Sequence, residues 1–237
     1  MGNRKDLTQP HPSSAPLSQL SRIGGRLCLD FVNTVGWRLT NRPNEWLRSY
    51  ADIVTWSLQG GVLHRTHANE LRRLAGRKEE KATSTLVRAR ELREALYLLF
   101  DRWRQRRSAP PVELRLLNRE LDGAPERSHL RSEQGGLVWE EERSAVRLER
   151  VIWPIVWSAS ELLTTGETHR LKLCAGEGCG WVYLDESRNR SRRWCSMSDC
   201  GNREKARRHY ARSKGSAGRA TKSRSSRGGG ARRKARS

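Results

Sequence analysis

Four of the five cysteines form two matched pairs towards the C-terminal end of the chain. Cys174 and Cys179 are separated by four residues, as are Cys195 and Cys200, and fifteen residues lie between the pairs. A short loop of small residues, such as the glycine-containing segment 175–178, lets the backbone turn so that two thiolates meet at one metal ion. The pattern therefore predicts one structural zinc ion (Zn²⁺), because four thiolate ligands leave no coordination position for a reacting water molecule.

Spacing alone leaves three other uses of these cysteines open. They could pair as disulfides, pack as buried free thiols, or hold an iron–sulfur cluster, which also takes four thiolates. The paired spacing and the flanking glycines favour zinc over the first two uses. The fifth cysteine, Cys28, stands apart from the pairs, and we interpret it as a small buried hydrophobic residue.

Basic residues surround the second cysteine pair. Good helix formers follow Gly201, so we predict a helix that ends near Gly215, and Glu204 is the only acid in it. Lysine and arginine side chains contact phosphates, whereas asparagine and arginine can also read base edges. We expect nucleic acid to contact the following residues, with Asn202 and Arg203 as the candidates for base contacts: Arg192, Arg193, Asn202, Arg203, Lys205, Arg207 and Arg208.

The positive charge is concentrated at one end of the chain. The 237 residues carry a formal net charge of +21, and residues 201–237 alone hold fourteen lysines and arginines against one acid, a net +13. Such a segment favours a polyanion as partner, because neutralising phosphates releases their counterions. Residues 215–237 are small, polar or basic, so we predict that they form a disordered basic tail.

We expect neither a membrane protein nor an exported one. The longest apolar run, residues 151–157, is far shorter than the roughly 20 residues that span a bilayer. Residues 1–20 are rich in Pro and Ser, lack the apolar core of a secretory signal, and are predicted to be a disordered lead-in. Clustered cysteines of this kind suit a reducing compartment, so the expected location is the cytoplasm, at the nucleoid if the protein binds DNA.

Helical periodicity dominates residues 21–170, which we predict to form one domain. Apolar stripes predict helices over 46–58, 67–75, 85–106, 111–121 and 151–163. Alternation over 27–31 predicts a strand that leads into a helix, and 137–140 is expected to pair with 145–148 as a hairpin. The expected fold class is α+β: a predominantly helical N-terminal domain with a small β-hairpin or sheet, then a zinc-ribbon or treble-clef-like finger over 171–214.

The finger resembles the CGNR zinc-finger family. Cys200-Gly201-Asn202-Arg203 is the tetrapeptide that names this family, and the similarity covers residues 174–205. Upstream, residues 27–34 and 162–164 resemble the ABATE domain, which usually precedes this finger in bacterial proteins. The resemblance implies a DNA-binding transcription regulator with a role in stress, whose metal ligands are Cys174, Cys179, Cys195 and Cys200.

Asp30, Asn33 and Thr34 are the polar residues in the first ABATE-like stretch. They could line a pocket for an unknown small-molecule ligand, or they could cap a helix and hydrogen-bond buried backbone groups. The sequence shows no Ser/His/Asp set, phosphate-binding loop or close pair of carboxylates, so we do not expect an enzyme.

We interpret the protein as a transcription regulator whose helical domain senses a signal, or positions or dimerises the DNA-binding finger. RNA binding or association with the ribosome is the alternative, because Trp181, Tyr183 and Trp194 could stack on bases if they are exposed. An enzyme built on the N-terminal domain is a second alternative. A single finger reads few base pairs, so specificity would require a homodimer or a partner protein.

Overall fold

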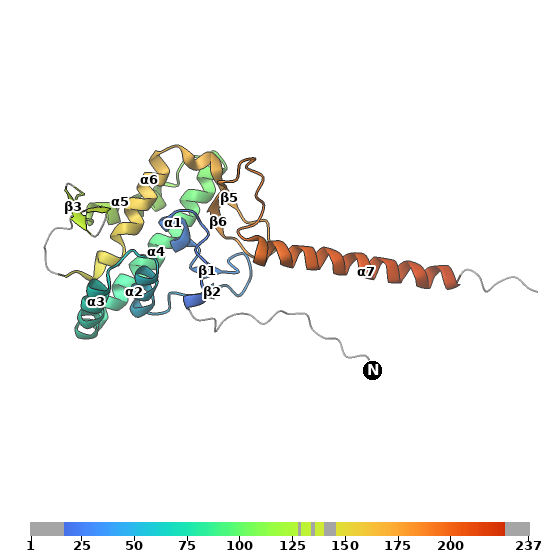
Figure 1. The fold of residues 1–237 in the computed structure, drawn as a ribbon, viewed down its shortest axis with the longest axis horizontal. Helices are drawn as coiled ribbons and strands as arrows, with labels where there is room; N and C mark the ends of the chain where they lie inside the picture. The colour runs from blue at the N-terminus through green and yellow to red at the C-terminus, as the bar shows by residue number, and fades with distance from the viewer. Residues whose placement is uncertain (1–16, 128, 134–135, 140–145, 226–237) are drawn as a thin grey trace, which may run out of the picture. The chain divides into compact units, whose positions relative to one another are not determined.

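The computed structural model describes residues 17–127, 129–133, 136–139 and 146–225 (Figure 1). The helices in these ranges are α1 (Leu27–Val32), α2 (Tyr50–Gln59), α3 (Arg65–Arg77), α4 (Glu79–Arg104), α5 (Pro111–Asp122), α6 (Trp153–Thr164) and α7 (Asn202–Ser225). Short 3₁₀ turns are η1 (Leu17–Gln19), η2 (Leu148–Val151) and η3 (Glu167–Arg170), and η4 (Met197–Gly201) is a π-helical turn. None of the described helices is long and apolar enough to cross a membrane.

The strands of the described residues form antiparallel pairs: β1 (Val35–Gly36) with β2 (Asn44–Glu45), β3 (Leu130–Glu133) with β4 (Gly136–Trp139), and β5 (Leu171–Leu173) with β6 (Val182–Leu184). Helices with small sheets confirm the predicted α+β class. The chain divides into two compact units between Cys195 and Ser196. The first unit includes β5 and β6, which were predicted to belong to the finger.

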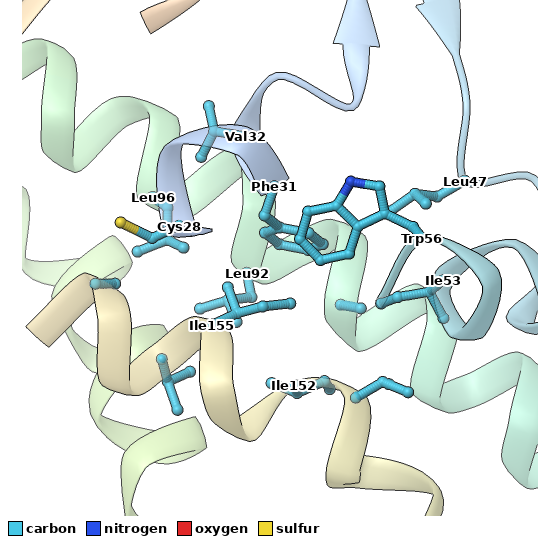
Figure 2. Packing of buried hydrophobic residues seen from close by; sticks show 14 of the residues in the cluster. Cys28, Phe31, Val32, Leu47, Ile53, Trp56, Leu92, Leu96, Ile152 and Ile155 are labelled. Atoms are coloured by element: carbon cyan, nitrogen blue, oxygen red, sulfur yellow. The ribbon is translucent and has the colours of Figure 1, made fainter. Parts of the chain in front are cut away.

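Helix α4 forms the centre of the first unit, and α1, α2, α3, α5 and α6 contact it or one another around it (Figure 1). Its predicted apolar stripe is buried: Leu86, Ala89, Leu92, Leu96, Leu99 and Phe100 are at most 5% exposed. Figure 2 shows Leu92 and Leu96 of this stripe near Phe31 from α1 and Ile155 from α6. Burial of such side chains is the main favourable term in the folding of this unit.

Residues 27–32 form a helix, so the predicted strand is wrong. Their alternating pattern is misleading because the segment is buried on several sides, with Cys28, Leu29, Phe31 and Val32 all inaccessible to solvent. Helix α1 packs against α6 and α4 and also contacts β6. The Phe31 ring lies 5.7 Å from that of Trp56 on α2, an inclined aromatic pair that joins the two helices (Figure 2).

A capping residue and a proline in the first turn set the beginnings of two predicted helices. Ser49 caps α2, since its hydroxyl accepts from the Asp52 amide and the Asp52 carboxylate accepts from the Ser49 amide at 2.7 Å. This capping box starts α2 four residues after Trp46, where the apolar pattern begins. Pro111 starts α5 as predicted, because a proline in the first turn sacrifices no helical hydrogen bond.

The predicted pairing of residues 137–140 with residues 145–148 is wrong. Strand β4 pairs with β3, which precedes it, with Leu130 opposite Trp139 and Glu133 opposite Gly136. Residues 140–145 lie outside the described residues, and Leu148 belongs to η2, where it is buried in the core. Leu148 thus reflects packing against the helices and not strand pairing, whereas Val146 is exposed.

Buried hydrogen bonds attach the β5–β6 hairpin to α1 and the segment after it. The Asn33 side-chain amide donates to the Val182 carbonyl oxygen at 2.8 Å, and its oxygen accepts from the Val182 amide at 2.9 Å. The Trp181 indole donates to the Val35 carbonyl oxygen at 2.8 Å. Because β5 and β6 are only three residues each, these bonds supply the pairing that a third strand would give.

The second unit consists of η4 followed by α7, as described to Ser225. Helix α7 is described as far as Ser225, past the end predicted near Gly215, and the disordered basic tail predicted from residue 215 stays a prediction. Residues 226–237, the rest of the predicted tail, and residues 1–16 of the predicted lead-in lie outside the described residues.

Replacing Asn33 by leucine should destabilise the zinc-loaded protein by at least about 2 kcal/mol, because the buried amide and carbonyl of Val182 both lose their partner. Urea unfolding followed by circular dichroism measures the loss. Asn69→Leu is the matched control, since Asn69 is exposed on α3. Equal stability of the two variants would contradict the role given to this pairing.

Candidate metal centre and basic helix

The β5–β6 hairpin positions the first cysteine pair. Cys174 directly follows β5, and its amide donates to the Trp181 carbonyl oxygen at 2.8 Å across the hairpin. Gly178 and Gly180 flank Cys179, and both have φ of 71°, which favours glycine because other residues are strained there. The chain therefore reverses sharply on both sides of Cys179, and the Cys179 thiol returns towards Cys174.

The same loop packs closely on the segment that follows β1. The amides of Arg38 and Leu39 donate to the carbonyl oxygens of Cys179 and Gly178, at 3.1 and 3.2 Å. A Cβ atom placed on Gly178 would lie 2.6 Å from a methyl carbon of Thr40, closer than real contacts allow. The glycines of this loop thus serve both its conformation and its packing.

The four paired cysteines form one buried cluster. Their sulfur atoms lie within 4.8 Å of one another, and the Cys179 and Cys195 sulfurs are 3.8 Å apart. Four thiolates at 2.3 Å from a tetrahedral zinc ion are about 3.8 Å from each other. The donor set therefore fits one structural zinc ion held by Cys174, Cys179, Cys195 and Cys200. None of the five cysteines, all of which lie in the described residues, forms a disulfide bond, and 3.8 Å is far beyond the roughly 2.05 Å of such a bond.

N–H groups are directed at the sulfurs of Cys174 and Cys200. The backbone amides of Gly176 and Cys195 donate to the Cys174 sulfur at 3.4 and 3.3 Å. The Arg203 guanidinium donates to the Cys200 sulfur at 2.8 Å, and it also pairs with Asp199 at 3.4 Å. Such donors lower the negative charge that four thiolates place around one divalent ion, and they fix the orientation of the ligands.

Asp185 organises the arm between the cysteine pairs. Its carboxylate is buried and accepts from the Lys172 ammonium at 2.6 Å, from the amide and hydroxyl of Ser187, and from the Arg192 amide at 3.0 Å. Burial alone would raise the pKa of this carboxyl, but the hydrogen bonds outweigh it and hold the pKa well below its ordinary value. The arm therefore folds around a fixed negative charge.

Two predicted nucleic-acid contacts belong to this arm. The Arg192 guanidinium lies 4.3 Å from the centre of the Tyr183 ring and donates to the carbonyl oxygens of Trp194 and Cys195. Arg193 is exposed, and its guanidinium lies 5.4 Å from the Trp194 ring. Arg192 thus supports the backbone at a metal ligand, while Arg193 faces solvent.

The remaining predicted contacts lie on α7. Asn202 is exposed, and its amide donates to the Ser198 carbonyl oxygen at 3.1 Å. Lys205, Arg207 and Arg208 are exposed on the helix, and Glu204 pairs with Arg207 at 3.0 Å and with Arg208 at 3.3 Å. The structure thus presents a group of cations along the first turns of α7.

The three polar residues after Gly24 all hydrogen-bond within the fold. Asp30 accepts from the Gly24 amide at 2.8 Å, and the Asn33 side-chain amide donates to the Val182 carbonyl oxygen. The Thr34 hydroxyl donates to the Phe31 carbonyl oxygen at 2.7 Å and accepts from Arg93 at 3.1 Å. Of the two roles considered for these residues, the contacts favour hydrogen bonding to buried polar groups over the lining of a ligand pocket.

The pair that orders the arm, Asp185 and Lys172, was not predicted from the sequence. The signal for Asp185 was the motif Asp185-Glu186-Ser187, in which an aspartate followed by a serine two residues later is typical of a turn closed by its own side chain. Lys172 carries no such signal, because a lysine in a short strand is ordinarily exposed. Trp181 and Tyr183, considered for base stacking, are at most 9% exposed.

A helical body that carries a four-thiolate cluster of this geometry defines a zinc-finger protein. Comparison with protein families agrees, since residues 170–213 match the CGNR zinc finger. Residues 25–166, more than half of the chain, match the ABATE family, described as "Putative stress-induced transcription regulator". The chain therefore belongs to the ABATE family. No curated protein matches it.

Removing one thiolate should abolish stoichiometric zinc binding. Cys195→Ala leaves three ligands, so we expect less than one zinc per chain by elemental analysis after dialysis. Cys28→Ala is the control and should keep one zinc per chain. Cys28 does not belong to the cluster of four sulfurs and packs against Ser158 instead, and burial raises the pKa of its thiol to about 12. One zinc per chain in both variants would refute the four-cysteine site.

Arg203→Ala should lower the affinity for zinc by roughly 10–100-fold, the usual effect of losing a hydrogen bond to a metal ligand. Competition with a chelator of known affinity measures the change. Arg207→Ala removes the same charge one turn further along α7, where the guanidinium pairs with Glu204, and should leave the zinc affinity unchanged. Equal affinities in the two variants would show that Arg203 does not support the metal centre.

Proposed function

We propose that the protein is a DNA-binding transcription regulator in which the zinc centre anchors α7 and α7 contacts the phosphate backbone. The observation that carries this proposal is the exposure of the helix. Between Asn202 and Ser213 no residue is buried, and Lys205, Arg207, Arg208 and Arg212 are all exposed. A helix with so little packing and so many like charges gains most from a polyanionic partner.

The contacts within the finger indicate two roles for its basic residues: contact with phosphate and support of the metal centre. Arg193, Lys205, Arg207 and Arg208 hold their charges at the surface and are the proposed phosphate contacts. Arg192 and Arg203 contribute mainly by supporting the backbone at Cys195 and the thiol of Cys200. Asn202, exposed at the start of α7, remains the proposed base contact, with Arg203 beside it.

The helical body is proposed to sense a signal, or to position or dimerise the DNA-binding finger, in a cytoplasmic, non-enzymatic protein. Support comes from the ABATE match over this body and from the regulatory description of that family. The buried bonds between Asn33 and Val182 join the body to the strand that follows the first cysteine pair. A change in the body thus has a direct structural route to the metal ligands.

The double variant Arg207→Ala/Arg208→Ala should bind random duplex DNA more weakly, with a shallower dependence on salt. Each lost phosphate contact lowers the slope of log affinity against log salt by about 0.9. Fluorescence anisotropy of zinc-loaded protein over a salt series measures both quantities. The control Arg72→Ala/Arg73→Ala removes the same charge from the exposed side of α3.

Three further arms of that experiment separate the alternatives. Chelation of zinc should abolish the difference between the two double variants, and removal of residues 215–237 should weaken binding without abolishing it. Tighter binding to RNA of equal length would redirect the function to RNA. Equal losses in the α3 and α7 variants would show that only net charge matters and would refute α7 as the contact helix.

A further inference from the structure

A cavity of about 560 Å³ lies at the C-terminal end of α4, within the first unit. Its lining is formed by the end of the helix, the turn that follows it, and η3, which packs against α4. The side chains that matter for binding are Trp103, Arg104, Arg106, Arg107, Ser108 and His169. Its volume is within the range of about 300–1,000 Å³ found for small-molecule sites.

The cavity is strongly cationic. Arg104 is neutralised by Asp101, whose carboxylate lies 2.6 Å from the guanidinium. Arg106 and Arg107 are exposed, and none of the described residues that line the cavity is acidic. Arg106, Arg107 and Ser108 therefore line a space to which the described residues contribute no carboxylate, and this favours a phosphate or carboxylate as ligand.

Arg106 occupies a position that favours glycine. Helix α4 ends in a Schellman motif, in which the Arg106 amide donates to the Trp103 carbonyl oxygen at 2.8 Å and the Arg107 amide to the Arg102 carbonyl oxygen at 3.0 Å. The motif requires a left-handed residue, and Arg106 has φ of 56°. An arginine there strains the backbone where glycine would not, and Arg106 is one of the residues that line the cavity.

Aromatic groups complete the site. Trp103 is half-buried and contacts the core, so its ring is held in place at the cavity wall. On η3, the His169 Nδ1 atom lies 3.1 Å from the Gly166 carbonyl oxygen and donates to it, which fixes the imidazole ring on its own turn. A planar ring on the ligand can stack on the indole while its anionic group meets the guanidinium groups.

We propose that this cavity binds a nucleoside monophosphate, with the base against Trp103 and the phosphate between Arg106 and Arg107. The site goes beyond the proposed DNA-binding function, because it requires no contact between α7 and DNA. The proposal assigns a class of ligand to the helical body. The description of the ABATE family mentions no ligand.

Titration calorimetry of the zinc-loaded full chain with the four ribonucleoside 5′-monophosphates tests the proposal. Inorganic phosphate and adenosine serve as half-ligands, and each should bind at least tenfold more weakly than the best monophosphate. Arg106→Gly removes one guanidinium and relieves the backbone strain, so it should weaken binding roughly tenfold or more. Because glycine suits the position, the urea midpoint of this variant should equal or exceed that of the wild type.

Arg115→Ala is the matched control, because Arg115 is exposed on α5 and lies outside the cavity lining. It should bind the monophosphates as the wild type does. No detectable binding to the wild type, or equal binding by Arg106→Gly and the wild type, would overturn the proposal. Loss of binding in Arg207→Ala/Arg208→Ala would also overturn it, by placing the nucleotide on α7.

A last arm distinguishes a free nucleotide from the backbone of a nucleic acid. Arg106→Gly should leave the affinity for random duplex DNA unchanged, whether or not α7 proves to be the DNA contact. If this variant weakens duplex binding while no monophosphate binds the wild type, the cavity is a phosphate contact for DNA, and the small-ligand proposal fails.

Discussion

The two hydrogen bonds between the Asn33 side chain and the Val182 backbone are the constraint on which the metal centre depends. A hairpin of two three-residue strands is too small to be stable alone, so β5 and β6 need a partner along β6. An asparagine side chain offers the same donor and acceptor as a peptide group, and Asn33 presents both at the end of a helix buried in the core. The position of the Cys174–Cys179 loop therefore follows from the packing of the helices.

Hydrogen-bond donors also offset the negative charge of the four thiolates. Four thiolates around one zinc ion carry a net charge of about −2, which is costly where all four side chains are buried. Backbone amides of Gly176 and Cys195 and the guanidinium of Arg203 are directed at this charge. Arg203 is the last residue of the tetrapeptide that resembles the CGNR family, and its observed contact links that signature to the stability of the centre.

Local signals in the sequence predicted much of the fold and of the site. The apolar stripe of α4 and the matched cysteine pairs were readable because each depends on spacing within one segment. The segment 27–32 was misread since its burial comes from elements distant in the chain, and β3 was missed because pairing depends on a partner. The roles of Asn33, Lys172 and Arg203 likewise depend on long-range or charge-assisted contacts that no periodicity reveals.

The exposure of α7 has a thermodynamic consequence. Helical segments with few buried side chains are held mainly by local hydrogen bonds, and they lose order gradually on warming instead of melting with a core. The first turns of α7 carry no buried residue, whereas the body is held by a dense apolar core. A partner that needs α7 as a helix must then offset the entropy lost on ordering it, so its affinity is expected to decline with rising temperature.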